Sequence, residues 1–377
     1  MKKRLDLIDT GVLYRNPAPG HVAICAFYPS LVVLSEKELL CVYRVGQALY
    51  SADGRLAALR STDGGRTWQQ AGMVWDPSNN APSNYSYTAP FISRLRSGAV
   101  IVLAKRLVAE HIDLAMFNPD TGGKKPSQLV LLQSEDNGNS WSPPALIDLP
   151  DGEVVSSHTS VIDLDDGRWM LCFERWKAWE RTEALHIRGF AMFSGDRGKT
   201  WGQRVDFPSA SDDEKMYSHS QYRRRRDGQI WALQWAQGIG GQTNFDVHLV
   251  TADPTGRHWS DPRPTGIPGQ TSCIADLGDG MAVAAYSKRE SGKPGIMAVH
   301  SEDDGANWDL EHEVMVWDAV GQEFLGVAHK PTYPASHDNI AFGKPDTVTL
   351  PDGDIIVSWW CTQACVTHIR YARLRLV

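Results

Sequence analysis

The sequence predicts an all-β fold: a six-bladed β-propeller with four antiparallel strands in each blade. Two recurring signals predict it, an eight-residue Ser-x-Asp-x-Gly-x-x-Trp box and a short polar turn between apolar segments. The box is complete at 61–68, 134–141, 194–201 and 301–308, and a degenerate copy at 251–259 keeps the Asp, Gly and Trp. The aspartates of these copies are 50 to 73 residues apart, so a chain of 377 residues holds about six units.

Each box has the composition of a tight turn between two strands. Its Asp side chain can accept backbone hydrogen bonds, its Gly can supply a positive φ, and its Trp can pack between neighbouring units. We therefore expect the boxes to be structural and to lie on the lower face of the propeller.

The polar turns between apolar segments predict one β-hairpin in each unit. These turns lie at 36–38, 96–98, 165–167, 226–228, 278–280 and 351–353. The segment 367–374 fits the third strand of the last blade, and the N-terminal segment 5–8 is expected to supply its fourth strand and close the ring. Neither a long helix nor a break in composition marks a second domain, so residues 1–377 are predicted to form a single propeller domain.

Composition and charge exclude several classes of protein. With 38 basic and 45 acidic residues, the net charge of −7 argues against a general binder of nucleic acid or anionic membranes. No apolar stretch reaches the ~20 residues of a membrane span, and no apolar signal-peptide core follows the basic start, so a cytoplasmic location is expected. The arginine run 223–226 is predicted to pair with local acids at a lower hairpin. The six cysteines are expected to be buried thiols.

Functional side chains are expected at the upper ends of the two inner strands of each blade, where the sheets meet a central pocket. Counting from each hairpin turn gives two columns of side chains there. The first column is Tyr28, Ala89, His158, His219, Thr271 and Lys344, and the second is Arg44, Lys105, Glu174, Trp235, Ser287 and Trp360. Because buried ionisable groups are rare unless they are paired or functional, the two columns indicate a site.

The charge balance of these columns favours an anionic ligand. Arg106 and Arg175 each follow a column residue, and Asp346 lies two residues beyond Lys344. Such a set of donors suits a sugar carboxylate or sulfate. Nearby aromatic residues could stack on sugar rings or could serve as packing; they are Tyr87, Trp176, Trp179, Trp235, Trp359 and Trp360.

The boxes and the six-unit layout resemble the sialidase-like superfamily, and the resemblance covers essentially the whole chain. It implies a six-bladed propeller with a carbohydrate site. At three positions the motifs of sialidases are changed: Phe27 stands where an Arg holds the sialate carboxylate, Lys344 where the catalytic Tyr is expected, and Trp360 where the Glu partner of that Tyr is expected. Ordinary sialidase activity is therefore not expected.

Three functions remain open. A glycosidase acting on an acidic or unusual sugar would use two carboxyl groups, for which Glu174 and Asp346 are candidates. Acids on the upper loops are further candidates: Asp53, Glu110, Asp113, Glu180 and Glu183. A lyase that cleaves a uronate-containing glycan by β-elimination would use His158, His219 or Tyr87 as base and cations against the carboxylate. The third function is a non-catalytic propeller that binds glycans.

The predicted catalytic residues are Glu174, Asp346, His158, His219 and Tyr87. The predicted substrate-binding residues are Tyr28, Arg44, Lys105, Arg106, Arg175, Trp235, Lys344 and Trp360. The expected partner is an anionic carbohydrate, with no nucleic acid, membrane or cofactor. An alternative places a divalent metal on His158 and His219, with a third ligand from His329, His337 or Asp338 on the long connector 309–343. The long loops 69–87 and 107–127 are also expected to be functional.

Overall fold

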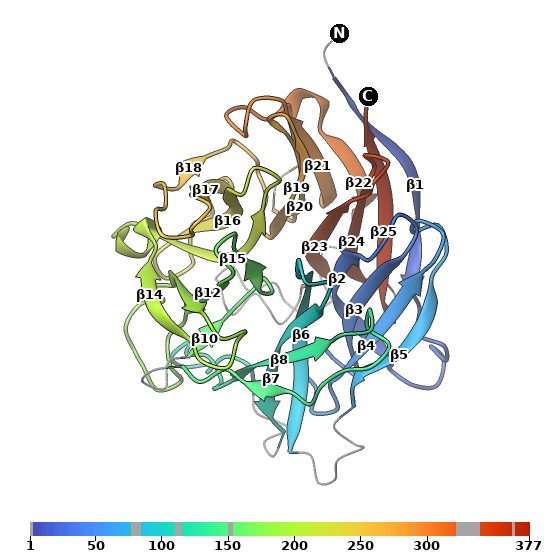
Figure 1. Cartoon of the computed structure of the whole chain (residues 1–377). Helices are drawn as coiled ribbons and strands as arrows, with labels where there is room; N and C mark the ends of the chain where they lie inside the picture. Colours follow the sequence, from blue (N-terminus) through green and yellow to red (C-terminus); the bar gives the residue numbers. More distant parts are fainter. Residues whose placement is uncertain are drawn as a thin grey trace.

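Six antiparallel sheets form a ring around one axis, as the repeat predicts (Figure 1). The computed structural model describes residues 3–76, 84–109, 115–149, 154–290, 292–321, 340–363 and 366–377. The helices are two short 3₁₀ turns in these ranges, η3 (Pro208–Ser211) and η4 (Leu310–His312). No helix in the described part of the chain is long and apolar enough to cross a membrane.

The first three blades use consecutive strands, ordered from the axis to the rim. Blade one contains β2 (Cys25–Val33), β3 (Leu39–Gly46), β4 (Arg55–Ser61) and β5 (Gln69–Trp75). Blade two contains β6 (Tyr85–Arg94), β7 (Val100–Val108), β8 (Gln128–Ser134) and β9 (Ala145–Leu146). Blade three contains β10 (Val155–Ser156), β11 (Ile162–Asp163), β12 (Trp169–Arg175), β13 (Arg188–Ser194) and β14 (Gly202–Asp206). Its inner strand is thus divided in two, and His158 lies in the gap.

Blades four and five follow the same order, and blade six joins the two ends of the chain. Blade four contains β15 (Lys215–Arg224), β16 (Ile230–Gly238), β17 (His248–Ala252) and β18 (Arg263–Pro264). Blade five contains β19 (Ser272–Gly278), β20 (Met281–Lys288), β21 (Gly295–Ser301) and β22 (Val314–Asp318). Blade six contains β23 (Phe342–Thr349), β24 (Ile355–Gln363), β25 (Val366–Leu376) and β1 (Leu5–Tyr14).

The N-terminal strand closes the ring. β1 pairs antiparallel with β25, from Leu5 opposite Leu376 to Tyr14 opposite Ile369, and the two strands lie side by side in Figure 1. The prediction of a closing N-terminal strand is confirmed, and the strand is longer than the segment 5–8. Because Leu5 is buried in the core between blades five and six, closure adds apolar contact as well as backbone hydrogen bonds.

The hydrophobic core is divided into layers between neighbouring blades. The layer between blades one and two contains Leu40 and Val42 of β3 packed with Val100 and Val102 of β7. Strands such as β3 are buried along their whole length because both of their faces contact a sheet. The described cysteines have free, buried thiols, as expected: Cys25, Cys41, Cys172, Cys273 and Cys361.

The boxes form self-contained turns that join the third and fourth strands of their blades. In the first box, Ser61 Oγ donates to Asp63 Oδ1 over 2.8 Å and accepts from the Gly65 amide over 2.8 Å. The Thr67 amide donates to Asp63 Oδ1 over 2.9 Å, and Trp68 Nε1 donates to the Gly65 carbonyl over 3.1 Å. The Asp side chain is therefore occupied by its own turn, which agrees with a structural role.

The glycine of each box also packs tightly against the preceding blade. Gly138 has a φ of 81°, and a Cβ added there would lie 2.5 Å from Leu40 Cδ2 of blade one. The boxes thus bring successive blades together at the lower face.

The arginine run begins at the end of β15, where Arg224 and Arg225 pair with acids as predicted, whereas Arg223 contacts an acid of blade six. Arg223 contacts Asp346, Arg224 Nη2 lies 2.7 Å from Asp165 Oδ2, and Arg225 Nη1 lies 2.9 Å from Asp304 Oδ1.

The packing of Gly138 gives a test of the interface between blades. We expect Gly138→Ala to lower the free energy of unfolding by about 1–3 kcal/mol more than Gly98→Ala, because the new methyl group would overpack the interface. Gly98 is a matched control, since it has a φ of 92° and open space around the added Cβ. Equal losses in chemical denaturation would contradict a role for the box glycine in blade packing.

Candidate functional site

A β-bulge shapes the inner strand of four blades. In blade one, Tyr28 and Pro29 stand opposite the single residue Tyr43 of β3, and blades two, four and six have the same irregularity. The first residue of each bulge has a left-handed backbone: Tyr28 (φ 54°), Ala89 (47°), His219 (55°) and Lys344 (53°). Bulges re-aim side chains, and these four residues belong to the first column that the sequence predicts.

The second bulge residue is proline in three of these blades, at positions 29, 90 and 345. Proline has no amide hydrogen, so it fits a position outside the ladder of hydrogen bonds. A proline inside an otherwise apolar strand is therefore a sequence signal for these bulges that the column count did not use.

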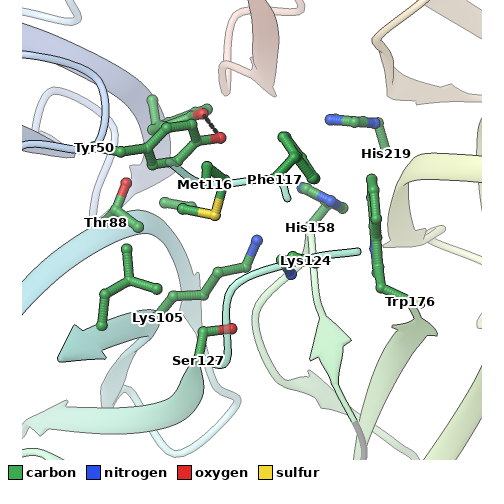
Figure 2. A pocket seen from close by; sticks show the side chains of 13 residues that line it. Tyr50, Thr88, Lys105, Met116, Phe117, Lys124, Ser127, His158, Trp176 and His219 are labelled. Atoms are coloured by element: carbon green, nitrogen blue, oxygen red, sulfur yellow. Dashed lines mark hydrogen bonds between the residues drawn. The ribbon is translucent and has the colours of Figure 1, made fainter. Parts of the chain in front are cut away.

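A pocket lies at the upper end of these strands (Figure 2). Its lining is Tyr28, Tyr50, Thr88, Ala89, Lys105, Leu107, Met116, Phe117, Lys124, Ser127, His158, Trp176 and His219. Four residues of the predicted site are among them: Tyr28, Lys105, His158 and His219. The cavity volume is about 30 Å³, which is room for water but not for a sugar ring.

His158 and Glu174 form the ionisable pair at one wall of the pocket. His158 Nε2 lies 3.3 Å from Glu174 Oε2, at ion-pair distance but without hydrogen-bond alignment. Burial lowers the pKa of His158 well below its usual range, and the neighbouring Lys344 lowers it further. Burial raises the pKa of Glu174 to about 7, against the opposing effect of nearby lysines. The imidazole is therefore neutral at pH 7 and can accept a proton.

Glu174 lies behind His158 rather than in the lining. Its side chain is only about 3% exposed, and its Oε1 accepts a 2.9 Å hydrogen bond from the Ser220 amide of blade four. On the pocket side, the rings of His158 and His219 are stacked with centroids 4.5 Å apart. The predicted Glu174 therefore contacts the lining through His158 and is not itself part of it.

Three buried lysines lie in or beside the pocket, and burial favours the neutral form of each amine. Burial lowers the pKa of Lys105 to about 8, that of Lys344 to about 7 and that of Lys124 well below its usual range. Lys344 Nζ lies 4.9 Å over the Phe91 ring and has no hydrogen-bond partner among the described residues. Lys124 Nζ donates to the Val155 carbonyl over 3.2 Å.

Lys124 and Tyr50 are pocket residues that the column count missed, because they lie on upper loops rather than on inner strands. Tyr50 lies between β3 and β4, and its hydroxyl is 3.0 Å from that of Tyr28. Burial raises the pKa of Tyr50. The length of the loop 107–127 was the sequence signal for Lys124.

Arg44 supports the pocket from behind. Its guanidinium is fully buried, with Nη2 donating to the Ser51 carbonyl over 2.8 Å, and burial lowers its pKa to about 10. It therefore fixes the turn that carries Tyr50 and is not part of the lining.

The structure places Asp346 below the pocket, in contacts between blades. Its Oδ2 accepts a 2.7 Å hydrogen bond from the Leu31 amide of blade one, and its Oδ1 accepts one from Arg223 of blade four. Both oxygens are occupied, so this geometry does not favour the predicted catalytic role.

Tyr87 and Arg106 lie away from the pocket. The Tyr87 ring packs 6.5 Å from that of Trp75, between blades one and two. Arg106 stacks 4.3 Å over the Tyr85 ring and donates to Gln128 over 2.7 Å. Strand alternation explains this, since a shift of one residue turns a side chain to the other face.

The tryptophans mostly pack behind the lining. Trp360 packs 5.3 Å from Phe27, Trp235 packs 5.6 Å from His219, and Trp359 is buried in the core between blades five and six. Trp176 forms a wall of the pocket, and Arg175 lines a neighbouring cleft beside it.

A metal site on His158 and His219 has no described third ligand, since His329, His337 and Asp338 lie outside the described residues. Among the described residues, one group could bring three ligand atoms within 4.8 Å of one another. It is Asp309, Glu311 and His312, and it lies at the surface.

The fold, its boxes and a polar pocket define a sialidase-like propeller. Within that class, the chain belongs to the family described as BNR repeat-like domain, which it matches over residues 100–357. A search of curated proteins gives no match.

Solved structures share the fold at low sequence identity. A protein of unknown function from Dyadobacter fermentans is 18% identical, with 99% of each chain covered and a TM-score of 0.71. The Hadza microbial sialidase Hz136 is 15% identical, with 98% of this chain and 68% of that chain covered and a TM-score of 0.64. A leech intramolecular trans-sialidase is 12% identical, with 98% and 70% covered and a TM-score of 0.61.

The buried amine of Lys344 allows a test of whether this site residue lowers the free energy of unfolding. We expect Lys344→Met to raise the free energy of unfolding at pH 7 by about 1–4 kcal/mol, because a buried amine with no hydrogen-bond partner among the described residues is replaced by an apolar chain of similar size. The unfolded chain binds a proton on Lys344 between pH 7 and 10.5 that the folded chain does not bind. The gain should therefore shrink as the pH rises through this window.

Denaturation of both forms at pH 7 and pH 10 checks this, with the exposed Lys37→Met as the control that should change little. A loss of stability in Lys344→Met at pH 7 would show that the amine has a stabilising partner.

Proposed function

We propose that this pocket binds an anionic saccharide and cleaves a glycosidic bond in it by hydrolysis. The observation that carries the proposal is the composition of the lining, in which the amines of Lys105 and Lys124 lie beside a neutral imidazole with a carboxylate behind it. A protonated amine holds a carboxylate or sulfate, and a neutral imidazole has a ring nitrogen that can accept a proton.

In this proposal, neutral His158 takes the hydroxyl proton from the Tyr28–Tyr50 pair as the tyrosine oxygen attacks the anomeric carbon, and the imidazolium so formed gives that proton to the leaving oxygen. Water, with His158 again as base, then hydrolyses the bond between the sugar and the tyrosine. Glycosidases usually use two carboxyl groups, but sialidases use a tyrosine nucleophile. The structural neighbours include the Hadza microbial sialidase and the leech intramolecular trans-sialidase, which supports a related chemistry here. Glu174 orients His158 and tunes its basicity through the 3.3 Å contact.

Binding of a sugar requires the lining to open. Met116 and Phe117, on the loop between β7 and β8, line the pocket together with Lys105 (Figure 2). Since the cavity of about 30 Å³ holds only water, these two side chains must move when a sugar ring enters.

A β-elimination is the second candidate, and one observation favours it. No carboxyl group lines the pocket in the part of the chain that is described. His158 would take the proton next to the carboxylate of a uronate, the bond to the leaving oxygen would break as the carbon–carbon double bond forms, and the Tyr28 hydroxyl would protonate that oxygen. The lysines would neutralise the uronate carboxylate.

Product analysis with a panel of acidic glycans separates these reactions. Hydrolysis gives a new reducing end, whereas elimination also gives an unsaturated uronate that absorbs at about 235 nm. We expect His158→Gln to reduce kcat by about 10²–10⁴-fold on the substrate found, as for the loss of an acid–base group.

The matched control is His300→Gln. His300 is also buried and lies 3.5 Å from Glu302, but outside the pocket lining. Full activity in His158→Gln, or an equal loss in His300→Gln, would remove His158 from the mechanism. Absence of any cleaved product across the panel would leave the non-catalytic function.

Anion binding should depend on pH with a defined sign. A lysine is charged below its pKa, and the pKa values of Lys105 and Lys344 are about 8 and about 7. We therefore expect galacturonate to bind more tightly at pH 6 than at pH 9, because both amines are charged only at the lower pH. Calorimetric titration measures the difference, and Lys105→Met should reduce it. The same affinity at both pH values would contradict a lysine-based anion site.

A further inference from the structure

A second, wider cleft lies on the upper face of blade three, in the loop between β12 and β13. It is lined mainly by Arg175, Trp176, Lys177, Arg181, His186 and Arg188, and its volume is about 420 Å³. This volume is within the range of small-ligand sites. Trp176 lines both this cleft and the inner pocket, so the two sites share one wall.

The cleft concentrates positive charge. Arg175 and Arg188 are directly opposite partners at the ends of β12 and β13, which places two arginines at one edge of the cleft. Lys177 and Arg181 add two more cations, whereas Glu183 is the carboxylate of the lining. Beyond His186 lie Asp212 and Asp213. The cations of the lining therefore outnumber its one acidic residue.

Contacts from both neighbouring blades hold the loop of the cleft in place. On the blade-two side, the Lys124 amide donates to the Lys177 carbonyl over 2.9 Å, and Thr121 Oγ1 donates to the Trp179 carbonyl over 2.6 Å. On the blade-four side, the Gly240 amide donates to the Leu185 carbonyl over 2.8 Å. The cleft is therefore preorganised, which reduces the entropy cost of binding.

We propose that this cleft binds the carboxylate or sulfate of a second sugar residue, so that the substrate is an acidic oligosaccharide whose chain passes from the pocket over Trp176. The inference rests on the proposed function, because the pocket must hold the first residue. Arginine suits this role, since its planar fork of donors matches both anions.

Binding of saccharides of increasing length tests the inference. The probes are galacturonate, trigalacturonate, a heparin-derived tetrasaccharide and neutral cellotriose. We expect trigalacturonate to bind at least about tenfold more tightly than galacturonate, and Arg181→Ala/Arg188→Ala to remove that advantage, as for the loss of charged hydrogen bonds. A preference for the heparin tetrasaccharide would identify sulfate as the anion, and cellotriose should not bind.

Arg257→Ala, on the exposed turn of the fifth box, is the control and should retain the advantage. Suppose that galacturonate and trigalacturonate bind with equal affinity and that Lys105→Met abolishes binding of both. That result would overturn the proposal that the cleft binds a second sugar residue but would leave the pocket proposal in place. A length advantage that depends on the arginines but not on Lys105 would support the cleft and count against the pocket. Binding that neither set of variants affects would overturn both.

Discussion

The bulge in the inner strands is the constraint on which the rest of the site depends. A regular strand would direct alternate side chains into the layers between blades, where apolar groups pack. The extra residue in blades one, two, four and six turns one side chain from each toward the upper axis, including Tyr28 and His219. Left-handed backbone at non-glycine residues costs free energy, so the surrounding blades must supply the stability that maintains it.

Buried carboxylates supply part of that stability by joining blades. Asp346 of blade six accepts the Leu31 amide of blade one, and Glu174 of blade three accepts the Ser220 amide of blade four. The two acids therefore have the same structural contact but different surroundings. Asp346 is neutralised by Arg223, whereas Glu174 lies beside His158 and among partly discharged lysines. Because of that difference, the proposed mechanism gives a role to Glu174 and none to Asp346.

The boxes and the pocket lie at opposite ends of the blades. They share no residues, so the pocket can change while the boxes stay the same. The Asp of each box is occupied within its own turn, so the boxes stabilise the propeller whatever the pocket binds. This explains how a chain can keep the sialidase-like fold while Lys344 and Trp360 occupy positions that differ from sialidases. The fold therefore identifies the family, and the reaction must be argued from the pocket.

The sequence by itself determined the six blades, the closing N-terminal strand and the column that contains Tyr28, His158 and His219. These follow from short-range signals, namely the boxes, the hairpin turns and the two-residue period of strands, which act within one blade. Only the tertiary structure decided that Asp346 is occupied and that Lys124 joins the pocket. Those outcomes depend on partners from other blades and on loop paths, and no local periodicity encodes which side chains meet across the axis.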